Sequence, residues 1–353
     1  MIKIKTRNAE HSIGQGMKPF IIAELSGNHD GSITKALELV DQAANSGVDA
    51  VKIQTYTADT MTLNIDKGEF LIDDPKSLWH GYNLYQLYEK ASTPWEWHEA
   101  IFKRCADHGI IGFSSPFDAT AVDFLESLGT PIYKIASFEL TDLPLVKKVA
   151  QTGKPLIMST GMATVAKIME SVEVAKTHGC KDLALLKCTS AYPADPATIN
   201  LNTIPHMRDL FKCEVGLSDH TLGLGASIAS VALGATIIEK HFTLDRSEGG
   251  VDAAFSLEPK EFASLVTECS AAQQSIGRVN YQKSSKEALS ATHRRSVYAS
   301  KDIKQGEQFS KNNVKVIRPG LGLKPKYYEV ILGKEAATDI SFGTPLALSL
   351  IHI

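Results

Sequence analysis

Two histidines lie in neighbouring apolar runs of this sequence. His220 lies in GLSDHT, and the next apolar run, IIEKHF, contains His241, 21 residues further along the chain. Two imidazoles with waters, or with a carboxylate, suit a divalent cation such as Mn²⁺, Zn²⁺ or Co²⁺. A structural zinc site takes four protein ligands, so an open catalytic site fits better. Taken alone, the pair is explained more simply as two buried histidines with ordinary hydrogen-bond partners.

Two lysines interrupt other apolar runs. Lys52 lies in AVKIQTY and Lys134 in IYKIAS. A buried ammonium group without a partner anion is costly, so we expect both lysines to face one. A phosphate or a phosphorylated carboxylate would satisfy them together with hydroxyl groups that end nearby runs, those of Ser115, Ser137, Ser159 and Ser218. The alternative is an internal Lys–Glu network that uses Glu24, Glu139 and Glu239.

A repeated pattern between Phe20 and Gly277 positions these residues. Eight short apolar runs each precede a longer amphipathic run, which predicts eight strand–helix units with a parallel sheet buried on both faces. No GxGxxG follows the first run, so we predict a closed (β/α)8 barrel. Glycines at the expected helix ends support this division, namely Gly47, Gly109, Gly129, Gly153, Gly179, Gly234 and Gly277.

In such a barrel, functional groups lie at the carboxyl ends of the strands and in the loops that follow. Only alternate strand residues face the interior, so about half of the polar residues at strand ends should reach the mouth. After Gly277 the stretch RVNYQKSSKEALSATHR predicts a linker, and short apolar runs beyond it predict a small β-rich domain. We assign residues 1–280 to the barrel, 281–292 to the linker and 293–353 to the small domain.

Composition excludes several classes of protein. There are 37 Lys and Arg residues against 40 Asp and Glu, a net charge of −3, so we expect no nucleic-acid arm and no membrane-binding patch. We also expect no secretory signal, since no apolar h-region opens the chain, and no membrane-spanning run of 18 apolar residues. Five cysteines without a CxxC pair fit a reduced, cytoplasmic compartment, where they act as small buried hydrophobes.

Eight segments in order resemble the sialic acid synthase family. They are IAELSGNHDG, AVKIQTY, FSSPFD, YKIASFE, MSTGMAT, LKCTSAYPA, GLSDHT and IIEKHFTLDRSEGGVD. The resemblance runs from about Phe20 to the C-terminus. It implies a metal-dependent (β/α)8 TIM barrel followed by a small antifreeze-like (SAF) domain. It also implies a transferase that condenses phosphoenolpyruvate with an acetamido sugar in its open-chain aldehyde form.

The insert after the second strand resembles the pseudaminic acid synthase branch of this family, through TYTADTMTLN and SLWHGYNLYQLYEKASTPWEWH. That branch implies the substrate 2,4-diacetamido-2,4,6-trideoxy-β-L-altropyranose, and the N-acetylneuraminate and legionaminate branches are the alternatives. Aromatic residues of the insert predict a lid over the methyl group of a 6-deoxy sugar, or else ordinary packing of a long loop on the barrel rim. They are Trp79, Tyr82, Tyr85, Tyr88, Trp95 and Trp97, of which Trp95 and Trp97 fit packing better.

The resemblance also assigns roles to individual residues. Contacts to phosphoenolpyruvate fall on Lys52, Ser115, Lys134, Ser137, Ser159 and Ser218. Sugar contacts and acid–base groups fall on Glu24, Gln54, Glu139, Tyr192 and Asp252, with Glu24 and Glu139 as the proton-transfer candidates. The ligands of a catalytic Mn²⁺, Mg²⁺ or Co²⁺ ion fall on His220 and His241.

Two further positions complete the implied site. Arg318 of the SAF domain would reach the mouth of a partner subunit, which implies a domain-swapped homodimer. Ser190 stands where the family usually has Asn in an NxYP motif, so we expect it to contact phosphoenolpyruvate through water. Two alternatives explain less. A phosphoenolpyruvate-dependent sugar-phosphate synthase would not explain the SAF-like domain, and a non-catalytic binding protein would not need both histidines and both lysines.

Overall fold

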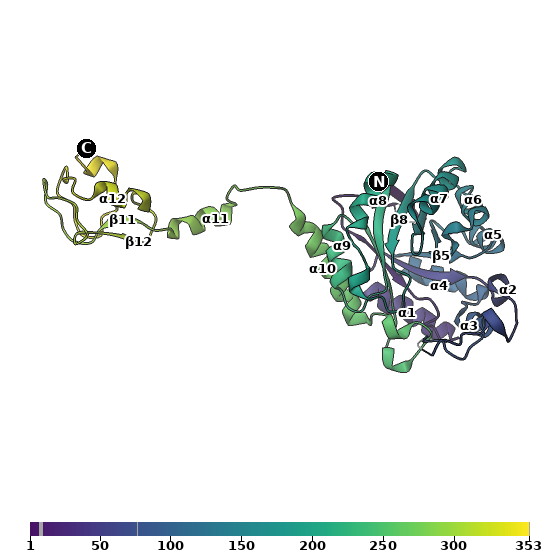
Figure 1. Ribbon diagram of the computed structural model, residues 1–353. Helices are drawn as coiled ribbons and strands as arrows, with labels where there is room; N and C mark the ends of the chain where they lie inside the picture. The colour runs from purple at the N-terminus through teal and green to yellow at the C-terminus, as the bar shows by residue number, and fades with distance from the viewer. Residues whose placement is uncertain (7–9, 76, 353) are drawn as a thin grey trace. The chain divides into compact units, whose positions relative to one another are not determined.

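The computed structural model describes residues 1–6, 10–75 and 77–352. The chain forms two compact units, Met1–Gly277 and Arg278–Ile353, and each is described by itself (Figure 1). The boundaries given above for the barrel, linker and small domain remain a prediction.

The first unit is a closed barrel of eight parallel strands, with helices packed around its outside (Figure 1). Strand β10 pairs with β3 and closes the ring. Each predicted apolar run contributes one strand, so the predicted fold class is confirmed. The strands are β3 (Phe20–Glu24), β4 (Ala50–Thr55), β5 (Ile111–Pro116), β6 (Tyr133–Ile135), β7 (Leu156–Ser159), β8 (Leu183–Cys188), β9 (Glu214–Asp219) and β10 (Ile237–His241).

Eight helices follow the eight strands and bury their apolar faces against the barrel. They are α1 (Ile33–Asn45), α4 (His98–Asp107), α5 (Ala119–Leu128), α6 (Leu143–Ala150), α7 (Val165–Thr177), α8 (Thr203–Phe211), α9 (Gly225–Ala232) and α10 (Pro259–Ile276). The insert between β4 and α4 adds two short helices, α2 (Ala58–Met61) and α3 (Leu84–Ala91). All seven glycines predicted at helix ends have positive φ, from 52° at Gly277 to 112° at Gly179, which a side chain would disfavour.

The barrel interior is apolar at the amino ends of its strands. Inward-facing residues such as Ile22, Phe113 and Leu186 form one buried cluster there. A hairpin of β1 (Ile2–Lys5) and β2 (Glu10–Ile13), which the sequence analysis does not predict, adds isoleucines to the same cluster. The amino end is therefore a packed core, and a ligand site inside the barrel belongs at the carboxyl end.

The second unit has a separate small core. Strand β11 (Ser296–Ala299) pairs antiparallel with β12 (Val314–Ile317), and a short helix, α12 (Tyr328–Ile331), contributes to the same buried cluster. The stretch predicted as a linker contains a helix, α11 (Ser285–Ser290), because Ser284 and Glu287 form a capping box at its start. In the ranges that the structure describes, no helix is both long enough and apolar enough to cross a membrane.

Candidate active site

Polar side chains line the carboxyl end of the barrel interior because strand residues alternate between the interior and the surrounding helices. On β10, Glu239 and His241 face inward. Between them, Lys240 points outward, where its Nζ lies 2.9 Å from Asp219 Oδ2 and both side chains are fully buried. Alternation therefore separates the polar strand-end residues into a set at the mouth and a set that stabilises the barrel.

Four charged side chains form a buried network at the mouth. Lys52 Nζ lies 2.5 Å from Glu24 Oε2 and 3.9 Å from Glu239 Oε2, and Lys134 Nζ lies 3.2 Å from Glu239 Oε1. None of the four is more than 5 % exposed. The internal Lys–Glu network is thus present for Glu24 and Glu239. Glu139 is not joined to it by any ion pair among the described residues.

The two ammonium groups of the network are not equally compensated, because Glu239 and Glu24 raise the pKa of Lys52 despite its burial. Burial alone would raise the pKa of Glu239, but Lys134 and Lys52 lower it to about 2, so this carboxylate is ionised. Burial raises the pKa of Glu24 despite the opposing charge of Lys52. Burial also lowers the pKa of Lys134, so its charged form is incompletely compensated. A ligand anion at the mouth would supply the missing negative charge.

Serine hydroxyls contribute to the mouth as well. Lys52 Nζ donates to Ser115 Oγ at 3.3 Å, and Ser218 Oγ donates to Glu239 Oε1 at 3.1 Å. Ser159 is buried at the end of β7, and its Oγ has no hydrogen-bond partner among the described residues. A buried hydroxyl in this state is a donor that a bound anion can satisfy.

Gly161 holds two more of the predicted hydroxyl groups close to its backbone. Its N–H donates to Ser137 Oγ at 3.1 Å. A Cβ at this position would overlap Ser190 Oγ and would lie 2.8 Å from Ser137 Oγ. Only glycine therefore allows the loops after β6, β7 and β8 to approach this closely. The contact of Ser190 with phosphoenolpyruvate through water remains a prediction.

The two predicted metal ligands lie side by side. The ring centroids of His220 and His241 are 5.3 Å apart, and the Phe255 ring packs against both. His220 Nδ1 lies 3.1 Å from the carbonyl oxygen of Thr189, an arrangement in which Nδ1–H donates and Nε2 carries the lone pair. Burial lowers the pKa of His241 well below its usual range, which favours the neutral imidazole that binds metals.

The surroundings of His241 fit a metal ligand. Its Nδ1 is buried without a hydrogen-bond partner in the described part of the chain, and Asp252 Oδ2 lies 3.8 Å from it. A buried nitrogen without a partner is costly, and a bound cation would remove that cost. No group of three or more His, Cys, Asp or Glu side chains among the described residues is arranged to hold an ion. An ion held by His220 and His241 would therefore take its remaining ligands from water or substrate, as in an open catalytic site.

A second polar chain leads from the lysines to the histidines. Gln54 Nε2 donates to Glu24 Oε1 at 3.0 Å and to Ser26 Oγ at 3.2 Å, and Ser26 donates to Asp252. Burial raises the pKa of Asp252 to about 6. The Tyr192 ring lies 4.5 Å from the ring of His220 and forms a wall of the mouth. The structure thus brings the predicted sugar-contacting residues Glu24, Gln54, Tyr192 and Asp252 together around the two imidazoles.

Two predicted residues are joined to this group by no hydrogen bond or ion pair among the described residues. Glu139 lies in a 3-10 turn, Glu139–Thr141, after β6, and its Oε2 is buried without a partner among the described residues. Burial raises the pKa of Glu139 to about 7. Arg318 belongs to the second unit and is exposed, and its contact with a partner's mouth remains a prediction.

Three residues of the mouth lie outside the predicted site. Glu239, proposed only for the alternative network, lies two residues before His241, so strand alternation alone could have placed it inside. Cys188 was expected to be an inert buried thiol, yet its Sγ lies 3.9 Å from His220 Nδ1. Ser26 has φ 46°, and nothing in the sequence marks its contact with Asp252, 226 residues away.

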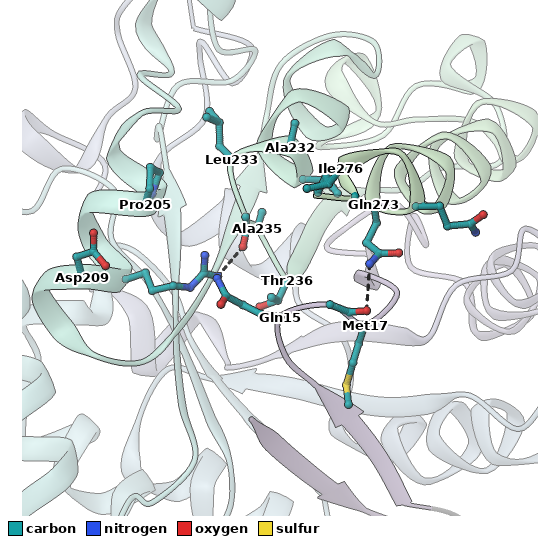
Figure 2. Close-up of a pocket in the computed structure, with 16 residues that line it drawn as sticks. Gln15, Met17, Pro205, Asp209, Ala232, Leu233, Ala235, Thr236, Gln273 and Ile276 are labelled. Atoms are coloured by element: carbon teal, nitrogen blue, oxygen red, sulfur yellow. Dashed lines mark hydrogen bonds between the residues drawn. The ribbon is translucent and has the colours of Figure 1, made fainter. Parts of the chain in front are cut away.

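A cavity of about 750 Å³ lies at the other end of the barrel, where the chain enters β3 and β10 (Figure 2). Gln15, Pro205, Asp209, Ala235 and Gln273 line it. Its lining within the described ranges includes none of the predicted site residues. The predicted site residues therefore lie at the opposite end of the barrel from this cavity.

A (β/α)8 barrel with buried lysines and paired histidines at its mouth, joined to a small β-containing unit, defines the class of this protein. Residues 39–281 match the NeuB family and residues 294–351 match the SAF domain. The chain belongs to the NeuB family. The resemblance to the sialic acid synthases is thereby confirmed.

Similar proteins cover nearly the whole chain. A pseudaminic acid synthase of Campylobacter jejuni subsp. jejuni serotype O:2 is 47% identical over 329 residues, which are 93% of this chain and 95% of that protein. A pseudaminic acid synthase of Helicobacter pylori is 43% identical, with 93% and 96% covered. The crystal structure of an N-acetylneuraminic acid synthetase from Leptospira borgpetersenii, in complex with citrate, has a TM-score of 0.71 and 30% identity, with 82% and 94% covered.

Proposed function

We propose that this protein is a pseudaminic acid synthase. It condenses phosphoenolpyruvate with 2,4-diacetamido-2,4,6-trideoxy-β-L-altropyranose, in its open-chain form, to give pseudaminic acid and phosphate. The two pseudaminic acid synthases that resemble this chain over more than nine-tenths of its length support this branch of the family. The observation that carries the chemistry is the pair Lys52 and Lys134, both buried on Glu239, at the same mouth as His220 and His241.

The reaction needs no covalent intermediate with the protein. C3 of phosphoenolpyruvate attacks the aldehyde carbon, a C–C bond forms, and the aldehyde oxygen takes up a proton to become a hydroxyl group. Water adds to the positively charged C2 and releases a proton. The bond between C2 and the phosphate oxygen then breaks, and phosphate leaves with that oxygen.

Lys52 and Lys134 hold the phosphate and carboxylate groups of phosphoenolpyruvate through charge-assisted hydrogen bonds. Ser115, Ser159 and Ser218 supply neutral donors beside them. Glu239 keeps both ammonium groups gathered before the substrate arrives, and the substrate competes with it for them. Such prior positioning lowers the cost of ordering two long side chains on binding.

Glu139 is better suited than Glu24 to move protons. Glu24 Oε2 forms an ion pair with Lys52, and Glu24 Oε1 accepts a hydrogen bond from Gln54. Glu139 has an oxygen without a partner among the described residues and a pKa of about 7, so both of its protonation states occur near neutral pH. We assign the proton transfer at the sugar oxygen or at the attacking water to Glu139, and the positioning of Lys52 to Glu24.

His220 and His241 are the residues that would hold a divalent cation, with Asp252 beside them. When bound, Mn²⁺, Mg²⁺ or Co²⁺ supplies Lewis acidity toward an aldehyde oxygen. Tyr192 and Phe255 cover the imidazoles with apolar surface, which limits the access of water to them.

Phosphate release from phosphoenolpyruvate tests this proposal. The purified protein should release phosphate with the 2,4-diacetamido-6-deoxy sugar and a divalent metal, and not after chelation. Stereoisomers of the 2,4-diacetamido-6-deoxy sugar test the legionaminate alternative. N-acetyl hexoses that keep the 6-hydroxyl group test the N-acetylneuraminate alternative. Faster turnover of one of those sugars would reassign the branch, and phosphate release with none of them would contradict the synthase.

His241→Ala tests the imidazole pair. We expect kcat to fall by about a hundredfold or more, because several kcal/mol of charge stabilisation is lost. The free energy of unfolding should change little, and Mn²⁺ affinity by calorimetry should fall. His206→Ala, on the exposed side of α8, is the control. Full activity of wild type in metal-stripped buffer, or of His241→Ala with Mn²⁺ present, would rule the pair out.

We further propose that the enzyme is cytoplasmic and works as a domain-swapped homodimer in which Arg318 of one subunit serves the mouth of the other. The five cysteines, all in described ranges, are free thiols, which supports a reducing compartment. The exposure of Arg318 supports a role outside its own unit.

A further inference from the structure

We infer that Trp79 and the cavity it lines receive the C6 end of the sugar, and that Trp79 thereby determines the preference for a 6-deoxy substrate. This inference rests on the proposed function and names the part of the protein that recognises the sugar. The experiment below distinguishes failure of the role of Trp79 from failure of the proposed function.

The cavity has a volume of about 210 Å³ and lies between two segments that are far apart in the sequence. The insert after β4 contributes one wall and the loop after β10 contributes the other, through Leu78, Trp79, Tyr82, Leu87, Val251 and Ala254. Lys90 and Gly250 complete the lining, and the Lys90 ammonium donates to the Tyr82 hydroxyl at 3.1 Å. Five of the eight lining residues carry apolar side chains, namely Leu78, Trp79, Leu87, Val251 and Ala254, and we place the methyl group of the sugar against these five.

A hydrogen bond fixes the Trp79 ring between these two walls. Its Nε1–H donates to the carbonyl oxygen of Val251 at 3.0 Å. Because the only polar group of the indole is satisfied by this bond, the remainder of the ring presents apolar surface. A hydroxyl group placed against that surface would lose its hydrogen bonds to water without replacement.

Aromatic contacts connect the cavity with the reacting centre. The Trp79 ring lies 6.1 Å from the ring of Tyr192, and the Tyr192 ring lies 4.5 Å from that of His220. An open-chain sugar whose aldehyde lies at the imidazoles can follow this surface, so that its C6 end reaches Trp79. Leu78, beside Trp79, is 50% exposed, so a bound methyl group would cover apolar surface.

Most of the other aromatic residues of the insert have different partners. Trp95 stacks on Phe124 at 4.6 Å, and Trp97 packs against His29 at 5.5 Å. Tyr88 packs against Tyr56 at 5.9 Å. The Tyr85 hydroxyl donates to Asp59. The packing alternative therefore applies to these four. Trp79 instead contacts Tyr192 at the mouth, and Tyr82 contacts Lys90.

The experiment compares two sugars in wild type, Trp79→Ala and Tyr85→Ala. The sugars are the 6-deoxy substrate and the analogue that carries a 6-hydroxyl group. One buried methyl contact is worth about 10- to 200-fold in kcat/KM, so wild type should prefer the 6-deoxy sugar by a factor in this range. Trp79→Ala should lose most of this preference and keep the KM for phosphoenolpyruvate. Tyr85→Ala removes an aromatic ring from the same insert and should keep the preference.

Two more variants keep the test decisive if Trp79→Ala does not fold. Trp79→Phe retains an apolar ring and should retain part of the preference. Ala254→Leu narrows the cavity from its other wall and should raise the KM for the sugar but not for phosphoenolpyruvate. An undiminished preference in Trp79→Ala, or in its absence an unchanged sugar KM in Ala254→Leu, would overturn the inference. Wild type that turns over no acetamido sugar would overturn the proposed function, and this inference with it.

Discussion

Burial raises the pKa of Glu139 from its ordinary value of 4.5 to about 7, and this shift links one side chain to both stability and turnover. Between these two pH values the folded protein binds more protons at this site than the unfolded chain does. The contribution of Glu139 to the free energy of unfolding is therefore fully present below pH 4.5 and is lost as the pH rises toward 7.

Glu139→Gln should remove this dependence. The free energies of unfolding of wild type and variant can be measured by urea denaturation at several pH values between about 4.5 and 7.5. The stability of wild type relative to the variant should fall as the pH rises through this range. The variant should also lose the limb near pH 7 from the pH profile of kcat. Glu38→Gln, on the exposed face of α1, is the control. If the free energies of unfolding of wild type and Glu139→Gln changed in parallel with pH, the raised pKa of Glu139 in the folded protein would be contradicted.

Charged residues of the site were predictable because burying them is expensive. Lys52 and Lys134 stand out within apolar runs, and such residues need partners wherever the chain folds. The residues that these charged side chains contact were harder to predict from the sequence. Glu239 follows from strand alternation, but the approach of Ser26 to Asp252 depends on how two loops 226 residues apart pack together. Sequence patterns are local and do not contain that information.

Among the elements, the eight barrel strands and the helix ends follow from short-range patterns of apolar residues and glycines. The hairpin of β1 and β2 was not predicted, because each strand has only four residues, too few to show a clear alternation of apolar and polar residues. Its stability comes instead from tertiary burial of Ile2, Ile4 and Ile13 in the barrel interior. Likewise, α11 is a six-residue helix within a polar stretch, and its capping box is its main local signal.

The loop between β7 and α7 gives a prediction at the scale of elements. Gly161→Ala should push apart the loops that carry Ser137 and Ser190, because the new Cβ would overlap Ser190 Oγ. We expect a loss of about 1–3 kcal/mol in the free energy of unfolding, as overpacking usually costs, and a higher KM for phosphoenolpyruvate. Urea denaturation and steady-state kinetics measure both quantities.

Gly225→Ala is the matched control for Gly161→Ala. It lies at the first residue of α9, and a Cβ there would meet no described atom within 4 Å. This control should keep its KM and gain up to about 1 kcal/mol of stability from the better helix propensity of alanine. If Gly161→Ala behaved like Gly225→Ala, the close approach of the three loops would not matter for substrate binding.

At the scale of the whole molecule, the two units have separate hydrophobic cores, with buried residues such as Leu186 in one and Phe309 in the other. A substitution at the barrel mouth should therefore leave the small unit folded, and the reverse should also hold. This independence makes it possible to ask whether Arg318 acts on the barrel of its own chain or on that of a partner.

Mixing two impaired variants answers that question. His241→Ala removes a mouth residue and Arg318→Ala removes the arginine, so each homodimer should be impaired. In a mixed dimer, the intact barrel of the Arg318→Ala chain meets the intact SAF domain of the His241→Ala chain. If the arginine acts across the dimer, an equal mixture after subunit exchange should regain about a quarter of wild-type activity, since half of the dimers are mixed and one mouth in each is complete. If the arginine acts within its own chain, each mouth still lacks one residue and the mixture stays inactive, even when mass spectrometry detects the mixed dimer.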